Sequence, residues 1–592
     1  MFLKKGRAME LTVNKSPLPQ AIGLLIALGA LGHSAAIAQV QPDAGSLMTI
    51  PAAPITAPPK APVFEIQQDV RPALVMPGGV KVKVNRFIVT GNTAYPSAEL
   101  EDLLSLQVNK ELDLAGLDRA ASLISRYYRN QGYFVARAYL PAQEVASGNI
   151  EITVIEGRLG GVKFTPTGTT RLLDTVAQGI VAEASPIGSP IKDTGIERGL
   201  MLLNDLPGVE VKSTLVPGTS VGTSDLVVET TQGALLGGAV DVDNFGNRFT
   251  GTNRLGGTLN VNDPSGSGDQ VILRAMTSQL GQGANDGGLR YFRAAYSLPV
   301  GSAGTKLGVA YTGMNYTLGQ DFAALNASGN SAIGGLFAVH PFVRSRNANL
   351  YGMATYDIKR IRDSQNGINV ADKGVSVLAL GFSGDMRDGY GGGGMTAGSV
   401  TLSGGNLNLD NVNFKANDDL TAKTGGSYSK LAYSLTRLQR LTDDWSLYTA
   451  FSGQAANKNL DSSEKFVLGG MGVRAYAQGE AAGDEGQMIN LEARYNVPGF
   501  KLQLTGFLDT GRVNLHKSTW NGWQPVGLPN FPNSYNLAGY GLGVNFSEES
   551  DYSIRASVAW KSGSNPGASA AGLDSDNNNT SPRLWLQATK QF

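Results

Sequence analysis

The chain has 592 residues, with 49 lysines and arginines, 49 aspartates and glutamates, three histidines and no cysteine. Its formal net charge of zero excludes the basic excess that is typical of nucleic-acid-binding proteins. The lack of cysteine excludes disulfide frameworks and thiolate metal sites. Because 592 residues are too many for one ordinary domain, we expect several domains.

The N-terminus has the features of a secretory signal peptide. Basic residues, among them Lys4 and Arg7, precede an apolar stretch at 21–32 that is too short to span a bilayer. A cleavage site of the A-x-A type follows at 36–38. The sequence therefore predicts that residues 1–38 are removed on export.

Residues 39–80 predict an extended linker. This stretch is rich in proline, which favours extended, semi-rigid chain and disfavours a packed domain. Within it, only residues 42–50 can form a short helical turn.

Two small α+β domains are predicted next, at 81–159 and 160–232. Each has the order β-α-α-β-β, so the second repeats the first in pattern. Apolar residues lie three or four positions apart in the expected helices, which predicts one buried stripe on each. The expected elements are strands 84–89, 136–140 and 149–155 with helices 97–106 and 114–130, then strands 161–164, 209–216 and 226–231 with helices 170–182 and 191–206.

Residues 233–592 predict a transmembrane β-barrel without helices. Ile489 and Leu491 share one face of a strand, and Asn490 and Glu492 share the other, as expected when one face meets lipid and the other a wet interior. An even number of strands is the rule for bacterial single-chain barrels. The sixteen expected strands are 234–245, 250–262, 269–280, 288–298, 305–316, 332–345, 348–360, 373–386, 394–403, 428–441, 445–457, 487–497, 501–512, 536–547, 551–561 and 582–592.

The links between these strands alternate in length. Tight turns follow the even-numbered strands, and long polar links such as 361–372, 404–427 and 458–486 follow most of the odd-numbered ones. In outer-membrane barrels the short turns face the periplasm and the long loops face outside. The α+β domains precede the first strand, so we expect them on the periplasmic side with the short turns.

Several short motifs, taken in order along the chain, resemble those of one family. They lie at 87–93 and 132–141 in the first α+β domain, at 203–209 in the second, and at 473–476 and 506–511 in the barrel. With these motifs the chain resembles the outer-membrane transporters of two-partner secretion (TpsB), which export haemolysins and filamentous adhesins. The resemblance covers nearly the whole chain. It implies two periplasmic POTRA (polypeptide-transport-associated) domains and a sixteen-stranded barrel in the bacterial outer membrane.

The resemblance also implies a site in which loop six, the link at 458–486, folds back into the barrel, so that its arginine meets an aspartate of a barrel strand. Asp509 shares its parity with Gln503 and Thr505, which we assign to the lumen. Parity alone leaves open a solvated aspartate and a flexible loop arginine. The site residues that the resemblance implies are Val473, Arg474, Ala475 and Tyr476 in the loop and Phe507, Asp509 and Gly511 on the strand.

The chain departs from the family pattern at two places. The family usually has glycine where this chain has Ala475, and alanine restricts the backbone more than glycine does. We expect the tip of the loop to survive this change. The family also often has an N-terminal helix that plugs the pore. Here only residues 42–50 are placed for that role, and they predict no more than a helical turn.

The resemblance implies a non-enzymatic pore that recognises a partner exoprotein through its N-terminal secretion domain, binds it with the POTRA domains and passes it to the cell surface. We expect outer-membrane lipid as a further partner, no nucleic acid, no cofactor, no metal and function as a monomer. The histidines at 33, 340 and 516 are too scattered for a metal site. The alternatives are an insertase of the same superfamily, a nutrient porin and an outer-membrane enzyme.

Overall fold

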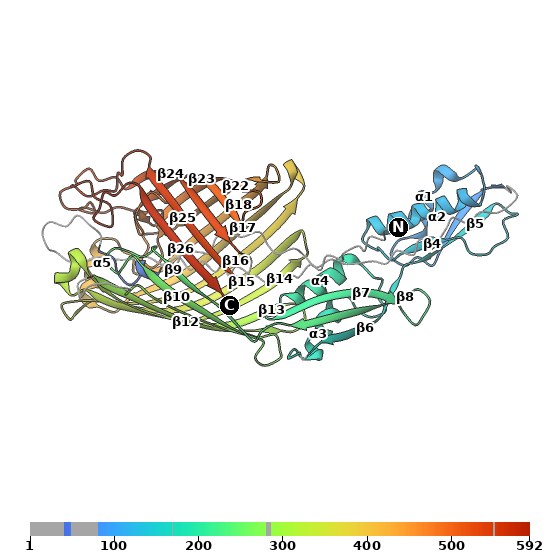
Figure 1. Ribbon diagram of the computed structural model, residues 1–592, viewed down its shortest axis with the longest axis horizontal. Coiled ribbons are helices and arrows are strands. Elements are labelled where there is room, and N and C mark those ends of the chain that lie inside the picture. The colour runs from blue at the N-terminus through green and yellow to red at the C-terminus, as the bar shows by residue number, and fades with distance from the viewer. Residues whose placement is uncertain (1–40, 49–80, 169, 280–285, 549–550) are drawn as a thin grey trace, which may run out of the picture.

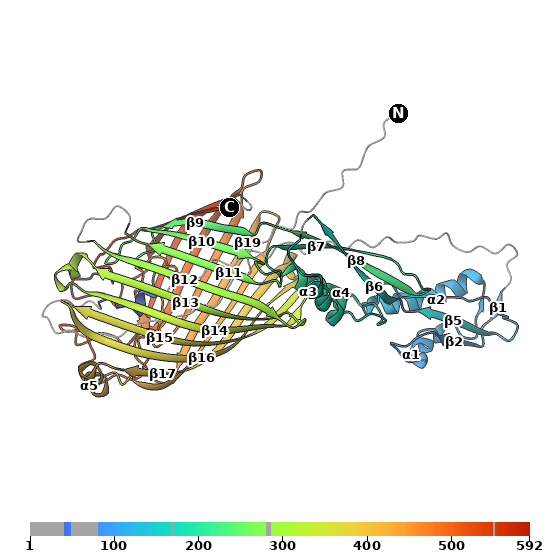
Figure 2. The same ribbon diagram turned by 90° about the horizontal axis from the view of Figure 1, so that it is seen from below.

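The computed structural model describes residues 41–48, 81–168, 170–279, 286–548 and 551–592. They form two small α+β domains followed by a closed barrel (Figures 1 and 2). The expected signal peptide, at 1–38, and most of the expected linker, at 39–80, lie outside the described residues. Among the residues that are described, no helix is both long enough and apolar enough to cross a membrane.

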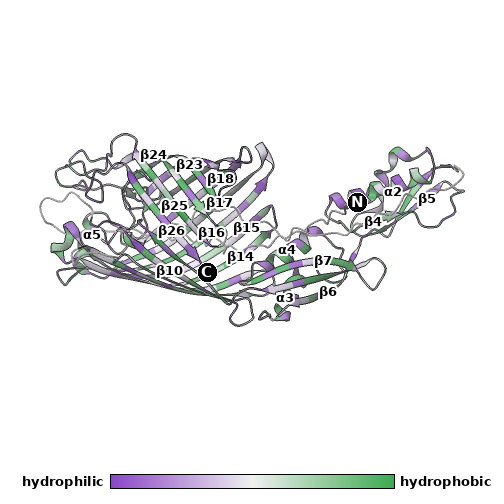
Figure 3. Cartoon of the chain, in the orientation of Figure 1, coloured by the Kyte–Doolittle hydropathy of each residue, from purple (hydrophilic) through white to green (hydrophobic). Residues whose placement is uncertain are grey.

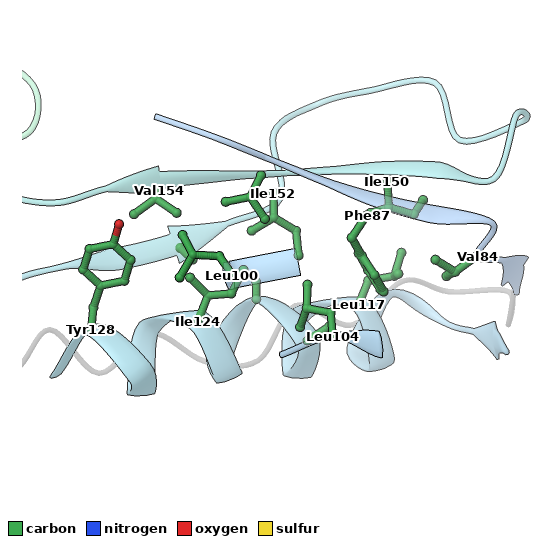
Figure 4. Packing of buried hydrophobic residues seen from close by; sticks show 14 of the residues in the cluster. Val84, Phe87, Leu100, Leu104, Leu117, Ile124, Tyr128, Ile150, Ile152 and Val154 are labelled. Carbon is green, nitrogen blue, oxygen red and sulfur yellow. The ribbon is translucent and has the colours of Figure 1, made fainter. Parts of the chain in front are cut away.

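The first domain packs two helices on a three-stranded sheet of order β2-β5-β4. Its long helix α2 begins after Asp113, whose side chain accepts a hydrogen bond of 2.7 Å from the Gly116 amide, and this caps the helix. Leu117, Ile124 and Tyr128 form the buried stripe of α2 beneath the sheet (Figure 4). Its elements are β1 (Val82–Lys83), β2 (Arg86–Thr90), α1 (Ser97–Asp102), β3 (Glu111–Leu112), α2 (Leu114–Asn130), β4 (Arg137–Tyr139) and β5 (Asn149–Ile155).

The second domain has the same architecture, with a sheet of order β6-β8-β7 and a core of its own. Leu203, Val211 and Leu226 are buried where the helices meet the sheet. The domain lies against the barrel beside the ends of β13 and β14 (Figure 1). Its elements are β6 (Arg158–Thr167), α3 (Asp174–Ala184), α4 (Asp193–Asn204), β7 (Val209–Pro217) and β8 (Thr223–Gln232).

Glu156 lies where the two domains meet and contacts residues of both. This buried carboxylate accepts hydrogen bonds of 2.6 Å from the amides of Thr93 and Ala94 and one of 2.9 Å from the Tyr128 hydroxyl. It also lies 3.7 Å from the guanidinium of Arg158, the first residue of β6. Burial by itself would raise the pKa of Glu156, but the hydrogen bonds, chiefly from Thr93 and Ala94, outweigh it and lower the pKa.

In the described part of the chain, sixteen antiparallel strands form the closed barrel, which confirms the predicted fold class. Alternate side chains face outward, and the apolar ones make the band that meets lipid (Figure 3). The strands are β9 (Leu236–Asp243), β10 (Arg254–Asn262), β11 (Gln270–Thr277), β12 (Gly287–Val300), β13 (Thr305–Leu318), β14 (Ser328–Arg344), β15 (Ala348–Gln365), β16 (Ile368–Asp388), β17 (Gly394–Leu409), β18 (Gly426–Arg440), β19 (Trp445–Ala456), β22 (Glu485–Asn496), β23 (Leu502–Asn514), β24 (Ser534–Ser547), β25 (Tyr552–Lys561) and β26 (Arg583–Gln591).

Two expectations for the extracellular side were wrong. The barrel region is not free of helix, because the link after β17 contains α5 (Val412–Leu420), which begins after Asn411 and is capped by its side chain. The expected long link at 361–372 is a tight hairpin instead. Here β15 and β16 continue to Asn366 and Gly367, whose φ angles of 47° and 78° suit a two-residue turn.

We expect Glu156→Gln to destabilise the first domain by about 1–3 kcal/mol at neutral pH, because a charged acceptor of several buried donors is lost. Since the folded-state pKa is lowered, the stabilisation is present above the unfolded value of about 4.5 and is lost as the pH falls through the folded value. Hydrogen exchange of residues 82–157 in the full-length protein measures both effects. The exposed Glu144→Gln serves as the control. Equal protection in both variants would contradict the role of Glu156.

Candidate functional site

Loop six, the sixth extracellular link, at 457–484 between β19 and β22, lies inside the barrel. Its short strands β20 (Phe466–Val467) and β21 (Ala482–Gly483) pair with each other, so the loop is itself a folded hairpin. Leu468 and Val473 are fully buried in a cluster with side chains of β23 and β24. The loop is therefore packed against the barrel wall.

Arg474 forms a bidentate ion pair with Asp509. Its Nε and Nη2 atoms donate to the two carboxylate oxygens at 2.8 Å each, and its backbone amide donates to the same carboxylate at 3.1 Å. The guanidinium also lies 3.5 Å from the centre of the Phe507 ring. The Asp509 side chain is fully buried, so removing one partner would leave an uncompensated charge.

Further groups complete this network. Glu492 accepts a hydrogen bond of 2.7 Å from Nη1 of Arg474, and the Asn490 side chain donates to Asp509 at 2.8 Å. Trp585 donates its indole N–H to the carbonyl of Arg474 at 2.7 Å. Trp585 belongs to β26 and is buried. Every polar atom of the arginine head therefore has an anionic partner.

Glycines on the barrel wall make room for the loop. A Cβ atom at Gly539 would lie 2.5 Å from the Cβ of Ala475, and one at Gly511 would lie 2.5 Å from a methyl group of Leu468. Ala475 does not have a positive φ angle and is buried against this wall, so alanine suits its conformation. Tyr476 is also fully buried and lies beneath Nζ of Lys561 at 5.6 Å.

Three lysines of the barrel wall hold the same loop from the other side, and sequence reasoning missed them. Glu464 of the loop lies 2.7 Å from Nζ of Lys359 and 2.9 Å from Nζ of Lys430. Lys373 lies 3.0 Å from Asp461. The signal was present in the sequence, because these lysines stand at lumen-facing positions of β15, β18 and β16.

A short N-terminal segment, at 41–48, occupies the lumen beside the loop (Figure 2, the isolated blue segment). Its residues Ser46–Met48 form one turn of 3-10 helix. Asp43 lies 3.4 Å from Lys373, and the Ala44 amide donates to Asp363 of β15 at 3.0 Å. Lys373 is thus shared between this segment and the loop.

The loop and the N-terminal segment both occupy space in the lumen, and paired charges of the barrel wall hold both of them there. Within the described ranges, no three histidine, aspartate or glutamate side chains are grouped as metal ligands.

Comparison with known proteins gives a consistent set of similarities. Residues 222–546 match the family described as haemolysin secretion/activation protein ShlB/FhaC/HecB, and residues 82–157 match the POTRA domain, ShlB-type. The heme/hemopexin transporter protein HuxB of Haemophilus influenzae is 28% identical over 97% of this chain and 99% of its own. The outer membrane transporter CdiB of Escherichia coli O6:K15:H31 is 31% identical over 40% of this chain and 37% of its own. The solved CdiB structure from Escherichia coli has a TM-score of 0.69 at 20% identity, over 88% of this chain and 93% of that one, and so shares the fold.

We expect Asp509→Asn to loosen the loop by about 3–5 kcal/mol, because it breaks a buried ion pair and leaves Arg474 partly unpaired. Hydrogen exchange of residues 457–484 measures the loss of protection. The control is Arg360→Ala, which removes an exposed pair with Asp410 and should cost about 0–1 kcal/mol. The prediction is wrong if the amides of the loop are equally protected from hydrogen exchange in the two variants.

We expect Asp43→Asn to release the N-terminal segment more often, because the variant side chain no longer forms an ion pair with Lys373. A charge-assisted hydrogen bond contributes about 1.5–3 kcal/mol, so the released fraction should rise about tenfold or more. Ion conductance in planar bilayers measures the change. Asp419→Asn, which removes an exposed pair within α5, should leave conductance unchanged.

Proposed function

This chain belongs to the haemolysin secretion/activation protein family ShlB/FhaC/HecB, and from that premise we propose that it carries a large partner exoprotein of the haemolysin or adhesin type from the periplasm to the cell surface. It is an outer-membrane β-barrel transporter with periplasmic POTRA domains. Its relatives are transporters and not enzymes. The observation that carries the proposal is a folded loop, held by Arg474 and Asp509, in the lumen of a barrel that bears POTRA domains.

Capture of the exoprotein is proposed to occur by strand addition in the periplasm. In the described part of the chain, the second sheet has the order β6-β8-β7, so the outer edge of β7 has no neighbouring strand. A free edge offers backbone hydrogen bonds to any extended chain, and this gives affinity without a fixed sequence. Such binding suits a protein that handles an unfolded client.

Passage through the barrel then requires the loop to leave its site. The bidentate pair at Arg474 is proposed to hold the closed state firmly between transport events. Folding of the client outside the cell is proposed to drive its movement, because neither strand addition nor release of the loop uses a nucleotide. The loop returns to Asp509 when the client has passed.

We expect Arg474→Ala to lower the amount of cognate exoprotein on the cell surface at least about tenfold, because without the buried ion pair the loop cannot return to its site after a client has passed. Protease treatment of whole cells measures surface exoprotein in a deletion strain that carries each variant. Arg512→Ala, an exposed residue of the same strand β23, should export normally.

The same deletion strain separates the alternatives. Unchanged surface exoprotein in the deletion strain would refute the transport proposal. A general loss of outer-membrane barrels would indicate an insertase instead. Loss of small-nutrient uptake, with export intact, would indicate a porin.

A further inference from the structure

The second domain covers only one half of the periplasmic opening of the barrel. The Leu173 amide donates to Gly266 in the β10–β11 turn at 2.8 Å, and Arg198 donates to Ala303 in the β12–β13 turn at 3.2 Å. Arg346, in the β14–β15 turn, donates its amide to Glu197 at 2.6 Å. These three consecutive turns form one continuous arc of the rim.

A strong ion pair fixes the domain on this arc. Arg344, the last residue of β14, donates from Nε and Nη2 to the carboxylate of Asp205 at 2.7 and 2.6 Å, and both side chains are largely buried. Nζ of Lys306 donates to the carbonyl of Asp205 at 2.9 Å. A bidentate pair that is shielded from water is stronger than a surface pair, so the domain stays over this half of the opening.

The opposite half of the rim is left uncovered. It includes the turns that follow β16, β18 and β22, which in Figure 1 end without a neighbouring domain. The hydrogen bonds of these turns go back to the barrel, as when Arg440 donates to Gly392 at 2.8 Å and the Leu441 amide donates to Trp445 at 2.9 Å. In the described part of the chain, the second domain therefore does not stand in the way of a polypeptide that approaches the lumen across this half.

The uncovered turns differ in chemistry from the covered ones. Tyr390 is 79% exposed, Phe500 is 72% exposed and Leu441 is 56% exposed. The covered turns at 263–268 and 301–304 consist of aspartate, proline, serine, glycine and alanine. Large apolar side chains are thus present at the tips on the open side, where nothing else in the described chain covers them.

We propose that the exported chain enters the barrel across this uncovered half of the rim, and that Tyr390, Leu441 and Phe500 bind apolar side chains of the extended polypeptide as it enters. This inference rests on the proposed transport function. Its partner is an unfolded chain with apolar side chains at intervals, because separate apolar tips on neighbouring turns match such a chain better than a folded surface.

The wall above these turns suits this path. Ser399 of β17 and Ser434 of β18 face the lumen and are hydrogen-bonded to each other at 2.7 Å, so their hydroxyl groups are already satisfied. At this point of the wall a passing chain therefore meets small polar groups and no apolar side chain.

The other occupant to consider for these tips is lipid of the inner leaflet. Trp445 and Tyr495 already lie side by side on outward-facing positions of β19 and β22, with ring centres 4.9 Å apart, as aromatic girdles do. Tyr390 and Phe500 lie in the turns, past the ends of their strands, and so extend beyond this girdle toward the periplasm. This placement favours the polypeptide.

Site-specific photocrosslinking tests the inference on the full-length protein in phospholipid vesicles. We would place p-benzoylphenylalanine singly at Tyr390, at Phe500 and, as the control on a covered turn, at the exposed Pro264. The probe is a fluorescent synthetic peptide of alternating valine and threonine. We expect the peptide to crosslink at positions 390 and 500 and not at position 264. Export is tested with a matched pair of variants. The double variant Tyr390→Ser, Phe500→Ser should reduce surface exoprotein, whereas the control Pro264→Ser should not.

Each other outcome decides against the inference or against its premise. Equal crosslinking at all three positions, or crosslinking at 264 alone, overturns the inference. Crosslinks from 390 and 500 to phospholipid instead of peptide overturn it in favour of membrane anchoring. If the peptide binds the unmodified protein but crosslinks nowhere, the inference fails while the proposed function stands. If the peptide does not bind the unmodified protein at all, proposed capture by the transporter fails as well.

Discussion

The structure depends first on a constraint of the membrane: no backbone amide or carbonyl can remain unpaired in lipid. A sheet meets this constraint only by closing on itself, and here β26 pairs with β9 to complete the ring. Once the barrel is closed, each strand has a lipid face and a lumen face. Every charged side chain on the lumen face then needs water or a partner, and this need shapes the interior.

The interior meets that need by folding parts of the chain inward. Lumen-facing lysines on β15, β16 and β18 and Asp509 on β23 find partners on the sixth loop, while Lys373 also binds the N-terminal segment. The charges that stabilise this arrangement are therefore supplied by segments outside the barrel strands. A barrel of this kind can be held closed strongly without a covalent or metal link.

Much of the fold follows from the sequence, because alternation is strong wherever a strand crosses lipid. All sixteen strands were predicted for this reason. The errors lie outside the lipid, where Arg360 and Arg362 on the outer face of β15 ended the apolar pattern although the strand continued. Parity placed Asp509 in the lumen, but the partners of Lys359 and Lys373 depend on the path of the loop, which no periodicity encodes.

The closing pair of strands has a consequence for how the protein forms. Asp243 of β9 pairs with Gln587 of β26, so the last ladder joins residues that are separated by more than half of the chain. Contacts between such distant residues are slow to form, because the entropy cost of closing the loop comes before any gain. Until then both edge strands expose unpaired backbone, which invites aggregation. Biogenesis of this protein should therefore depend on helper proteins that shield those two edges until the ring is complete.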